Sequence, residues 1–311
     1  MNAARAWVLA GPTASGKSAL ALDLAEAFSG TVINADASQL YRELPILSAQ
    51  PHAADRARAP HRLYGCRSAG EPASAGQWRD WALAEIAAAQ AAGRQPLLVG
   101  GSGLYLQALS RGLAPIPPVP VAVRTAAEAL LEELGPAGLH ARLAREDPAT
   151  AAALAPGDRQ RLLRAWSVLR ASGRPLSAWQ SDARAAAPKL TWIVLLPERA
   201  WLRQAVAARF EAMLAAGALE EVRRLLALNL DPTLPAMKAV GVRELTAVLD
   251  GRASLEAASA QAVTATRQYL KRQTTWLRHQ VLAGEADVHV WHAQYSCALG
   301  QKIVRFLREG R

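Results

Sequence analysis

The segment from Gly11 to Ser18 has the residue types that bind phosphate groups. It reads Gly11-Pro12-Thr13-Ala14-Ser15-Gly16-Lys17-Ser18 and matches the pattern G-x-x-x-x-G-K-[ST] at every fixed position. Glycines let successive backbone N–H groups converge on phosphate oxygens, and the N-terminus of a following helix adds partial positive charge. Lys17 offers a point charge for a terminal phosphate, and the Ser18 hydroxyl is suited to ligate Mg²⁺. The sequence therefore predicts a P-loop with Ser18 as its metal ligand, against the alternative of a chance glycine turn.

Asp36 is the second candidate for chemistry, because it directly follows a short apolar run at 31–35. A carboxylate at the C-terminal end of a parallel strand beside a P-loop faces the ligand crevice. It could ligate Mg²⁺ or take a proton from a nucleophile, and the alternative is that it caps the next turn. The P-loop leaves its cargo open, since ATP, GTP and any diphosphate ester offer the same oxygens. An NTPase also needs an acidic metal ligand at a strand end, and the apolar run at 95–101 ends in two glycines.

Short apolar runs alternate with helical stretches over the first hundred residues. We expect strands at 6–10, 31–35 and 95–101, with helices at 17–28 and 76–92. Strands that alternate with helices form parallel βαβ units. The sequence therefore predicts an α/β fold with a doubly wound parallel sheet.

A proline-rich segment at 114–120 ends this alternation. The chain from 121 to about 184 is then typical of helices separated by Gly and Pro breaks, and an apolar run at 191–196 indicates that the sheet resumes. Further helices are expected from 200 to 282 and a last strand at 288–291. We expect a P-loop core with C-terminal helices, residues 1–114 and 188–311, and a helical insertion domain at 115–187.

The chain is basic, with a formal net charge of +10 and a pI of about 10.3 over 311 residues. Such an excess indicates a polyanionic partner, most commonly nucleic acid, and the alternative is an arginine-rich solvated surface. Cys66 and Cys297 match no metal or redox spacing and suit a reducing compartment. Residues 1–10 lack the apolar core of a signal peptide, and no apolar run approaches the ~20 residues of a membrane span. We therefore expect a cytoplasmic protein without a membrane partner.

Seven sequence blocks occur in an order that resembles the tRNA dimethylallyltransferases, also called tRNA isopentenyltransferases. The resemblance spans nearly the whole chain, and the last block together with GGSGLY is specific to that family. The blocks are GPTASGKS (11–18), INADASQLY (33–41), PHRL (60–63), LLVGGSGLYLQAL (97–109), GDRQRLLRA (157–165), MKAVGVRE (237–244) and TATRQYLKRQTTWLR (264–278).

The resemblance implies transfer of a dimethylallyl group from dimethylallyl diphosphate to N6 of the adenosine 3′ to the anticodon of certain tRNAs. In family terms the P-loop, including Lys17, grips the diphosphate leaving group with Mg²⁺, and no nucleotide is hydrolysed. Asp36 matches the proposed general base, and Ser102 stands where the family has a Thr in GGTGLY. The adenine is stacked in the anticodon loop, so we expect it to be extruded into a pocket. A monomer would suffice for this reaction.

The family's tRNA contacts fall on several polar and basic stretches of this sequence. Between Gln261 and Gln280 there are four Lys or Arg residues and no acid, and Arg267, Lys271 and Arg278 recur at helical spacing. Such a stripe suits an RNA backbone, and a solvated helix face is the alternative. The expected tRNA-binding residues are Asp36, Ala37, Ser38, Gln39, Ser102, Arg124, Gln160, Arg161, Leu162, Leu163, Arg164, Lys238, Ala239, Val240, Gly241, Val242, Arg243, Lys271, Arg272 and Arg278.

The sequence departs from the family pattern at Ala37, where a Ser is usual, at Val242, where a Tyr is usual, and at Trp166-Ser167. We expect these changes to alter tRNA affinity before chemistry. Tyr269 and Trp276 fit a core role better than a stacking role, and Arg209 is interpreted as a surface or packing residue. His61 could position a substrate or serve a loop.

Two other functions remain open from the residues alone. One is a P-loop kinase for a small hydroxylated metabolite, with Asp36 as its base. The other is a non-catalytic RNA-binding protein whose P-loop only binds nucleotide. The basic helical insertion and the basic segment RQYLKRQ (267–273) favour an RNA-modifying transferase, since a metabolite kinase needs neither.

Overall fold

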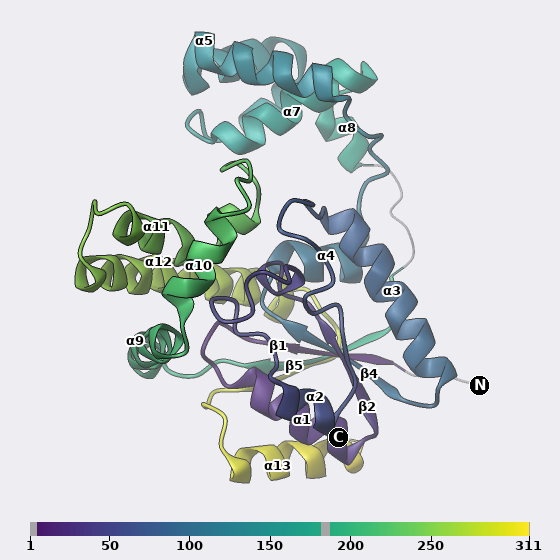
Figure 1. The fold of residues 1–311 in the computed structure, drawn as a ribbon. Coiled ribbons are helices and arrows are strands. Elements are labelled where there is room, and N and C mark those ends of the chain that lie inside the picture. Colours follow the sequence, from purple (N-terminus) through teal and green to yellow (C-terminus); the bar gives the residue numbers. More distant parts are fainter. Residues whose placement is uncertain (1–4, 182–186, 311) are drawn as a thin grey trace. The chain divides into compact units, whose positions relative to one another are not determined.

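The computed structural model describes residues 5–181 and 187–310, and the chain divides into two compact units (Figure 1). Unit 1 consists of Met1–Ser110 and Ala187–Arg311, and unit 2 is Arg111–Ala186. Among the described residues, no helix is both long and apolar enough to cross a membrane.

A six-stranded sheet forms the centre of unit 1, and all of its pairings are parallel. The strand order is β3-β2-β4-β1-β5-β6, so the expected doubly wound α/β fold is confirmed. The carboxyl ends of the neighbouring strands β1, β4 and β2 therefore lie at one edge of the sheet. The strands are β1 (Ala6–Ala10), β2 (Gly30–Asn34), β3 (His61–Arg62), β4 (Gln95–Gly100), β5 (Leu190–Leu195) and β6 (Val288–Trp291).

Strand β3 is an element that the sequence did not predict. It has only two residues, which pair with Val32 and Ile33 at the edge of the sheet. A two-residue strand has no apolar run or alternation to reveal it. His61 therefore belongs to the sheet edge, which fixes where its side chain begins.

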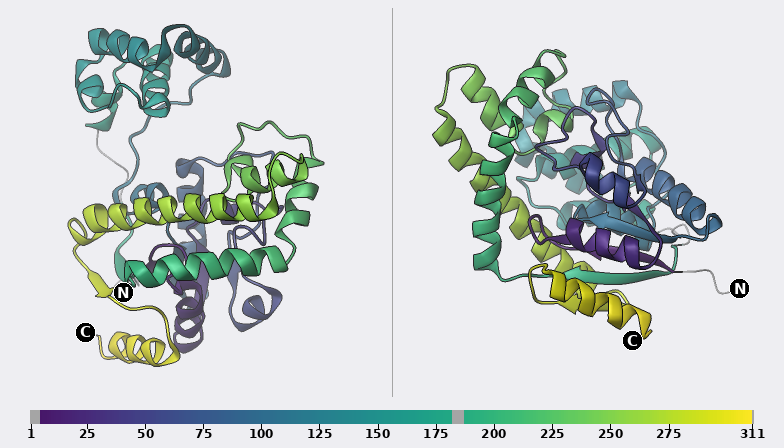
Figure 2. Two further views of the ribbon diagram at one scale, coloured as in Figure 1. Left: turned by 90° about the vertical axis from the view of Figure 1, so that its left-hand side faces the viewer. Right: turned by 60° about the horizontal axis from the view of Figure 1, so that its bottom comes forward.

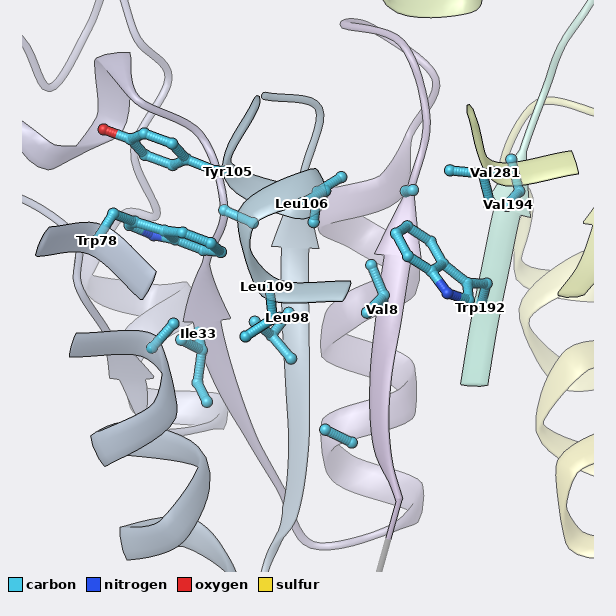
Figure 3. Close-up of a cluster of buried hydrophobic side chains, with 14 of the residues drawn as sticks. Val8, Ile33, Trp78, Leu98, Tyr105, Leu106, Leu109, Trp192, Val194 and Val281 are labelled. Atoms are coloured by element: carbon cyan, nitrogen blue, oxygen red, sulfur yellow. The ribbon is translucent and has the colours of Figure 1, made fainter. Parts of the chain in front are cut away.

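Helices α3 (Ala75–Ala91) and α4 (Gly103–Arg111) and the π-helix η3 (Leu277–Leu282) cover one face of the sheet (Figure 3). The Trp78 indole stacks on the Tyr105 ring with centroids 4.6 Å apart, and its Nε1 donates a hydrogen bond to the Asn34 carbonyl at 2.9 Å. Helix α3 begins with a capping box at Ser74 and buries residues at helical spacing. This packing ties the end of β2 to the helical layer.

Helices α1 (Lys17–Ala27) and α13 (Cys297–Arg308) cover the opposite face, with α2 (Ala53–Arg58) beside α1 (Figure 1). Leu20, Leu24 and Ile303 are buried together in this layer. Helix α13 lies beyond the last element that the sequence pattern predicts. Tyr295, just before α13, donates from its phenol to Asp23 on α1 at 2.9 Å. The C-terminal helix thus packs against the helix that follows the P-loop.

The remaining helices of unit 1 follow β5, and α9 and α12 lie side by side (Figure 2). Leu44 and Tyr41, from the loop after β2, are buried in a cluster with residues of α10 and α11. Glu221 of α10 is buried and accepts hydrogen bonds from the backbone N–H groups of Ile46 and Leu47 at 2.7 and 2.9 Å. The elements are α9 (Arg199–Ala215), α10 (Ala218–Leu226), η2 (Ala236–Lys238), α11 (Val242–Leu249) and α12 (Leu255–Trp276).

Unit 2 is helical throughout its regular structure, with a core of its own that includes Leu139, Leu162 and Trp166. The longest helix breaks at Gly135, where φ is +66°, directly before a proline. The Trp166 ring has the Arg170 guanidinium 4.1 Å from its centroid. The helices are α5 (Val121–Glu146), α6 (Pro148–Ala152), α7 (Arg159–Ser172) and α8 (Leu176–Gln180).

Candidate active site

The P-loop connects β1 to α1, as the sequence predicts. Gly16 has a φ of +86°, which favours glycine, and a Cβ at Gly11 would lie 2.8 Å from the Leu195 carbonyl oxygen. The Ser15 N–H donates to the Pro12 carbonyl at 3.2 Å, which closes the turn. The fixed glycines of the motif are therefore required by the loop's shape.

Not every backbone N–H of this loop is available to a ligand. The Thr13 N–H donates to the side chain of Gln273 at 2.8 Å, and the Ser15 N–H is used within the turn. Four other N–H groups have no protein acceptor among the described residues, and they are suited to phosphate oxygens. They belong to Ala14, Gly16, Lys17 and Ser18.

Lys17 is the positive charge at the base of the loop. Its burial lowers the pKa of the ammonium group from 10.5 to about 8, while Asp36 acts in the opposite direction. Its Nζ lies 3.4 Å from the Pro12 carbonyl oxygen, which is a weak contact. Lys17 is half-buried with so little compensation that an anionic ligand would stabilise its charge.

A cavity of about 540 Å³ opens beside the P-loop. Lys17, Arg58 and Arg209 line it, against a single lining carboxylate, Asp55. Positive charges in a partly enclosed space attract anions. The other lining residues include Ser18, Gln39, His61 and Tyr64.

Asp36 follows β2 and is oriented by its neighbours. The buried Asn34 side chain accepts from the Asp36 N–H at 2.8 Å and donates to the Asp36 carbonyl at 2.9 Å. The Asp36 Oδ1 accepts from the backbone N–H and hydroxyl of Ser38 at 3.0 and 2.7 Å. Asp36 therefore does hold the start of the 3₁₀ turn η1 (Ser38–Leu40), which is the capping role that the sequence leaves open for it.

The same carboxylate also belongs to the charged group at the P-loop. Its negative charge acts to raise the pKa of both Lys17 and Arg209. These interactions place Asp36 within electrostatic reach of both cations at the carboxyl edge of the sheet. Capping and chemistry are compatible, because the bonds from Ser38 occupy only one carboxylate oxygen.

Ser102 connects the loop after β4 to the Asp36 segment. Its Oγ accepts from the Ala37 N–H at 2.9 Å, and its own N–H donates to the Ala35 carbonyl at 3.2 Å. A Cβ at Gly100 would lie 2.2 Å from the Ala35 carbonyl oxygen, so the two loops are in direct contact. Ser102 thus orients the backbone that carries Asp36.

Arg209 is a site residue that the sequence interpretation missed. It lines the cavity together with Lys17, and burial lowers the pKa of its guanidinium group while Asp36 acts to raise it. It is one turn beyond Val206 and directly before Phe210, which are both buried. An arginine on the buried side of an amphipathic helix was the available signal.

The expected tRNA-binding residues of the loop between η2 and α11 are only partly accessible. Lys238 and Arg243 are exposed, whereas Gly241 is buried with a φ of +97°. Val242 is 1% exposed and packs in the cluster of α10 and α11. The side chain of Val242 therefore serves packing, and the expectation that it contacts tRNA does not fit its burial.

The expected basic stripe is exposed on unit 1, at Arg267, Lys271 and Arg272 of α12 and at Arg278 of η3. Arg267 and Lys271 share a groove of about 190 Å³ with Arg199 and Arg203 of α9. Its lining contains no carboxylate. This groove adds two arginines to the stripe that the sequence predicts.

Tyr269 and Trp276 are only half-buried and contact the loop after β4. The Tyr269 phenol lies near Ser102 and Gln273, and burial raises the pKa of Tyr269. A Cβ at Gly103 would lie 2.6 Å from the Trp276 ring. Both aromatic residues therefore contribute to the wall of the site as well as to packing.

Within unit 2, Arg124, Gln160, Arg161 and Arg164 are exposed, and Arg161 lies 3.5 Å from Asp158. Leu162 is fully buried in the core of the unit, while Leu163 is partly buried. The polar members of this stretch are accessible to an RNA strand, and the apolar members hold the helix in place.

The few oxygen donors at the P-loop suit a hard cation whose other ligands come from the bound phosphate groups and water. No cluster of three or more His, Cys, Asp or Glu side chains suited to a metal occurs in the described part of the chain. Ser18 is exposed on the first turn of α1 and lines the cavity beside the P-loop. Mg²⁺ binds in this way, through few protein oxygens together with water and phosphate.

Comparison with known proteins places this site in a family. The IPP transferase family model matches residues 39–280. A tRNA dimethylallyltransferase of Rhodospirillum centenum is 61% identical over 279 residues, which cover 89% of this chain and 89% of the relative. A tRNA dimethylallyltransferase of Gluconobacter oxydans is 50% identical over 312 residues, which cover 98% and 94%.

A solved structure agrees with these relatives. The full-length tRNA isopentenylpyrophosphate transferase of Bacillus halodurans superimposes with a TM-score of 0.70 and is 28% identical. The superposition covers 98% of this chain and 96% of that protein.

Proposed function

Because this chain belongs to the IPP transferase family, we propose that it transfers a dimethylallyl group from dimethylallyl diphosphate to N6 of the adenosine 3′ to the anticodon in tRNAs. The products are N6-(dimethylallyl)adenosine and diphosphate. The observation that carries the proposal is that Lys17 and Arg209 line one cavity, with the Asp36 carboxylate in electrostatic reach of both. Two cations suit a departing diphosphate, and the carboxylate suits the proton of an incoming amine.

The first half of the reaction is departure of the leaving group. The N6 lone pair of adenine is delocalised into the ring, so N6 attacks an allylic carbon only as the carbon–oxygen bond to diphosphate breaks. Negative charge then grows on the diphosphate. The free N–H groups of the P-loop, Lys17 and Arg209 stabilise that charge, which is often the largest single contribution to catalysis.

The second half is loss of the N6 proton. As the bond between N6 and the allylic carbon forms, the amine becomes acidic and its proton passes to Asp36. A general base of this kind contributes roughly 10²–10⁴-fold to the rate. Ser102 fixes the backbone beside the base through the Ala37 N–H. The proton balance of the step is complete without a further reactant.

Mg²⁺ bound by Ser18 and the diphosphate oxygens would neutralise charge on the leaving group. The chain's own residues bind the substrate, orient it and accept the proton. A site for this reaction must also keep water from the allylic carbon, because water would otherwise hydrolyse the diphosphate ester.

The exposed cations of α7, α12 and α9 suit the tRNA backbone, and their surfaces lie on both units. We place the reaction in the cytoplasm, where tRNA is available and where free thiols such as Cys66 and Cys297 stay reduced. A monomer holds all of the residues that the reaction uses.

Transfer of label tests the proposed function. The protein is incubated with Mg²⁺, unmodified tRNA and dimethylallyl diphosphate labelled in the allyl group, with no ATP present. We expect label in the RNA and release of one diphosphate for each label. An absolute requirement for ATP, or hydrolysis of the diphosphate without RNA labelling, would refute it.

A further inference from the structure

Gln273 joins three segments that meet at the active site but lie far apart in the sequence. Its side chain is 4% exposed. Its Oε1 accepts from the Thr13 N–H in the P-loop at 2.8 Å, and its Nε2 donates to the Gly101 carbonyl after β4 at 3.0 Å. One amide group of α12 therefore bridges the loops that follow β1 and β4.

The fit around this amide is tight. A Cβ at Gly101 would lie 2.3 Å from the Gln273 Nε2 and 3.0 Å from the Gly11 carbonyl oxygen. The Tyr269 phenol, one turn earlier on α12, lies near Gln273 and Ser102. Glycine at position 101 thus allows the amide to reach both loops at once.

Each loop that Gln273 holds carries a different half of the proposed reaction. Thr13 comes directly before the part of the P-loop in which the N–H groups of Ala14, Gly16, Lys17 and Ser18 have no protein acceptor among the described residues. Gly101 precedes Ser102, which holds the Ala37 N–H directly after Asp36. A displacement of either loop would change the distance between the leaving group and the base.

We propose that Gln273 is a positioning residue that couples the diphosphate grip of the P-loop to the Ser102–Asp36 segment. This inference rests on the proposed function for its chemistry. By accepting from Thr13, Gln273 fixes the loop with its free N–H groups arranged for diphosphate. By donating to Gly101, it fixes the loop that orients the base. A positional error of about 1 Å at such a site can cost about 10²-fold in rate.

The test compares Gln273→Met with Gln268→Met. Methionine has a similar length but forms neither hydrogen bond, and Gln268 is an exposed residue of the same helix. We expect Gln273→Met to weaken binding of Mg²⁺ and inorganic diphosphate about 10-fold or more in calorimetry, and to lower kcat about 10²-fold. Binding of tRNA and the unfolding transition should change little, and Gln268→Met should match the wild type in diphosphate binding.

A double-mutant cycle with Ser102→Ala separates positioning from general stability. If Gln273 acts on the base through the Ser102 loop, Gln273→Met should lower kcat much less in the Ser102→Ala background. Additive losses would overturn the coupling, and wild-type diphosphate affinity in Gln273→Met would overturn the role in the P-loop. Diphosphate binding requires no transfer to RNA, so a failure of the proposed function would leave this result readable.

Discussion

Replacement of Lys17 by methionine should make the ligand-free protein more stable while it abolishes diphosphate binding. Burial lowers the pKa of Lys17 from 10.5 to about 8, so keeping the ammonium charged at neutral pH makes folding less favourable. A tenfold change in an equilibrium constant is about 1.4 kcal/mol. A fall in pKa from 10.5 to about 8 therefore corresponds to a penalty of at most about 3.5 kcal/mol at pH 7. A methionine side chain at this position would not carry that penalty, because it has no charge to bury.

The sign of the pH dependence identifies the cause. The unfolded chain binds more protons at Lys17 than the folded protein between pH 8 and 10.5, so the wild type gains stability as the pH rises through that range. The penalty is complete below pH 8 and falls to about 1 kcal/mol or less at pH 10. The advantage of Lys17→Met should shrink by the same amount.

The assay is urea unfolding followed by tryptophan fluorescence at pH 7 and pH 10, without diphosphate. Lys189→Met is the matched control, because Lys189 is exposed and its loss changes the net charge equally. Calorimetry with Mg²⁺ and diphosphate should show no binding to Lys17→Met at concentrations that saturate the wild type. If the variant is no more stable than the wild type at pH 7, or if it gains the same stability at both pH values, the charge of Lys17 does not destabilise the ligand-free protein.

Three further changes separate the roles of the other site residues. Asp36→Asn keeps an oxygen that can accept the Ser38 hydrogen bonds but cannot take up the proton. We expect kcat to fall about 10²–10⁴-fold, while filter-binding assays show unchanged tRNA affinity. Loss of tRNA binding would instead make Asp36 a structural residue. Arg209→Met removes a cation from the cavity. The KM for dimethylallyl diphosphate should therefore rise about 10–100-fold in steady-state kinetics, while tRNA affinity, the internal control, should not change. Arg161→Ala with Arg164→Ala should weaken tRNA binding and reduce the slope of log affinity against log salt by about 2, and an unchanged slope would remove this pair from the interface.

The parts of the site that the sequence predicted are those set by local structure. The P-loop needs glycines at Gly11 and Gly16 for steric reasons that act within a few residues, so its pattern is readable in a single sequence. Asp36 was found because a short apolar strand precedes it and the parallel sheet then fixes which edge it occupies.

The missed parts depend on contacts between distant segments. Arg209 enters the site only because α9 crosses beside the P-loop, and Gln273 reaches Thr13 over 260 residues of chain. No local period marks such residues as functional. Val242 shows the same dependence on packing, since its side chain is buried in a helical cluster within a stretch expected to contact tRNA. Only the packing decides whether a residue in a basic stretch faces solvent.

The charges of the site also explain why a divalent metal suits the proposed reaction. Lys17 and Arg209 carry two positive charges beside one negative charge on Asp36, so this group has a net charge of one. A fully ionised diphosphate ester carries about three negative charges, and the protein group alone leaves about two of them unbalanced. A bound Mg²⁺ would supply that difference without a further buried side chain, which would itself need compensation in the empty protein. The lack of an acidic metal cluster among the described residues follows from the same argument, because added carboxylates would repel the diphosphate that the cavity must hold.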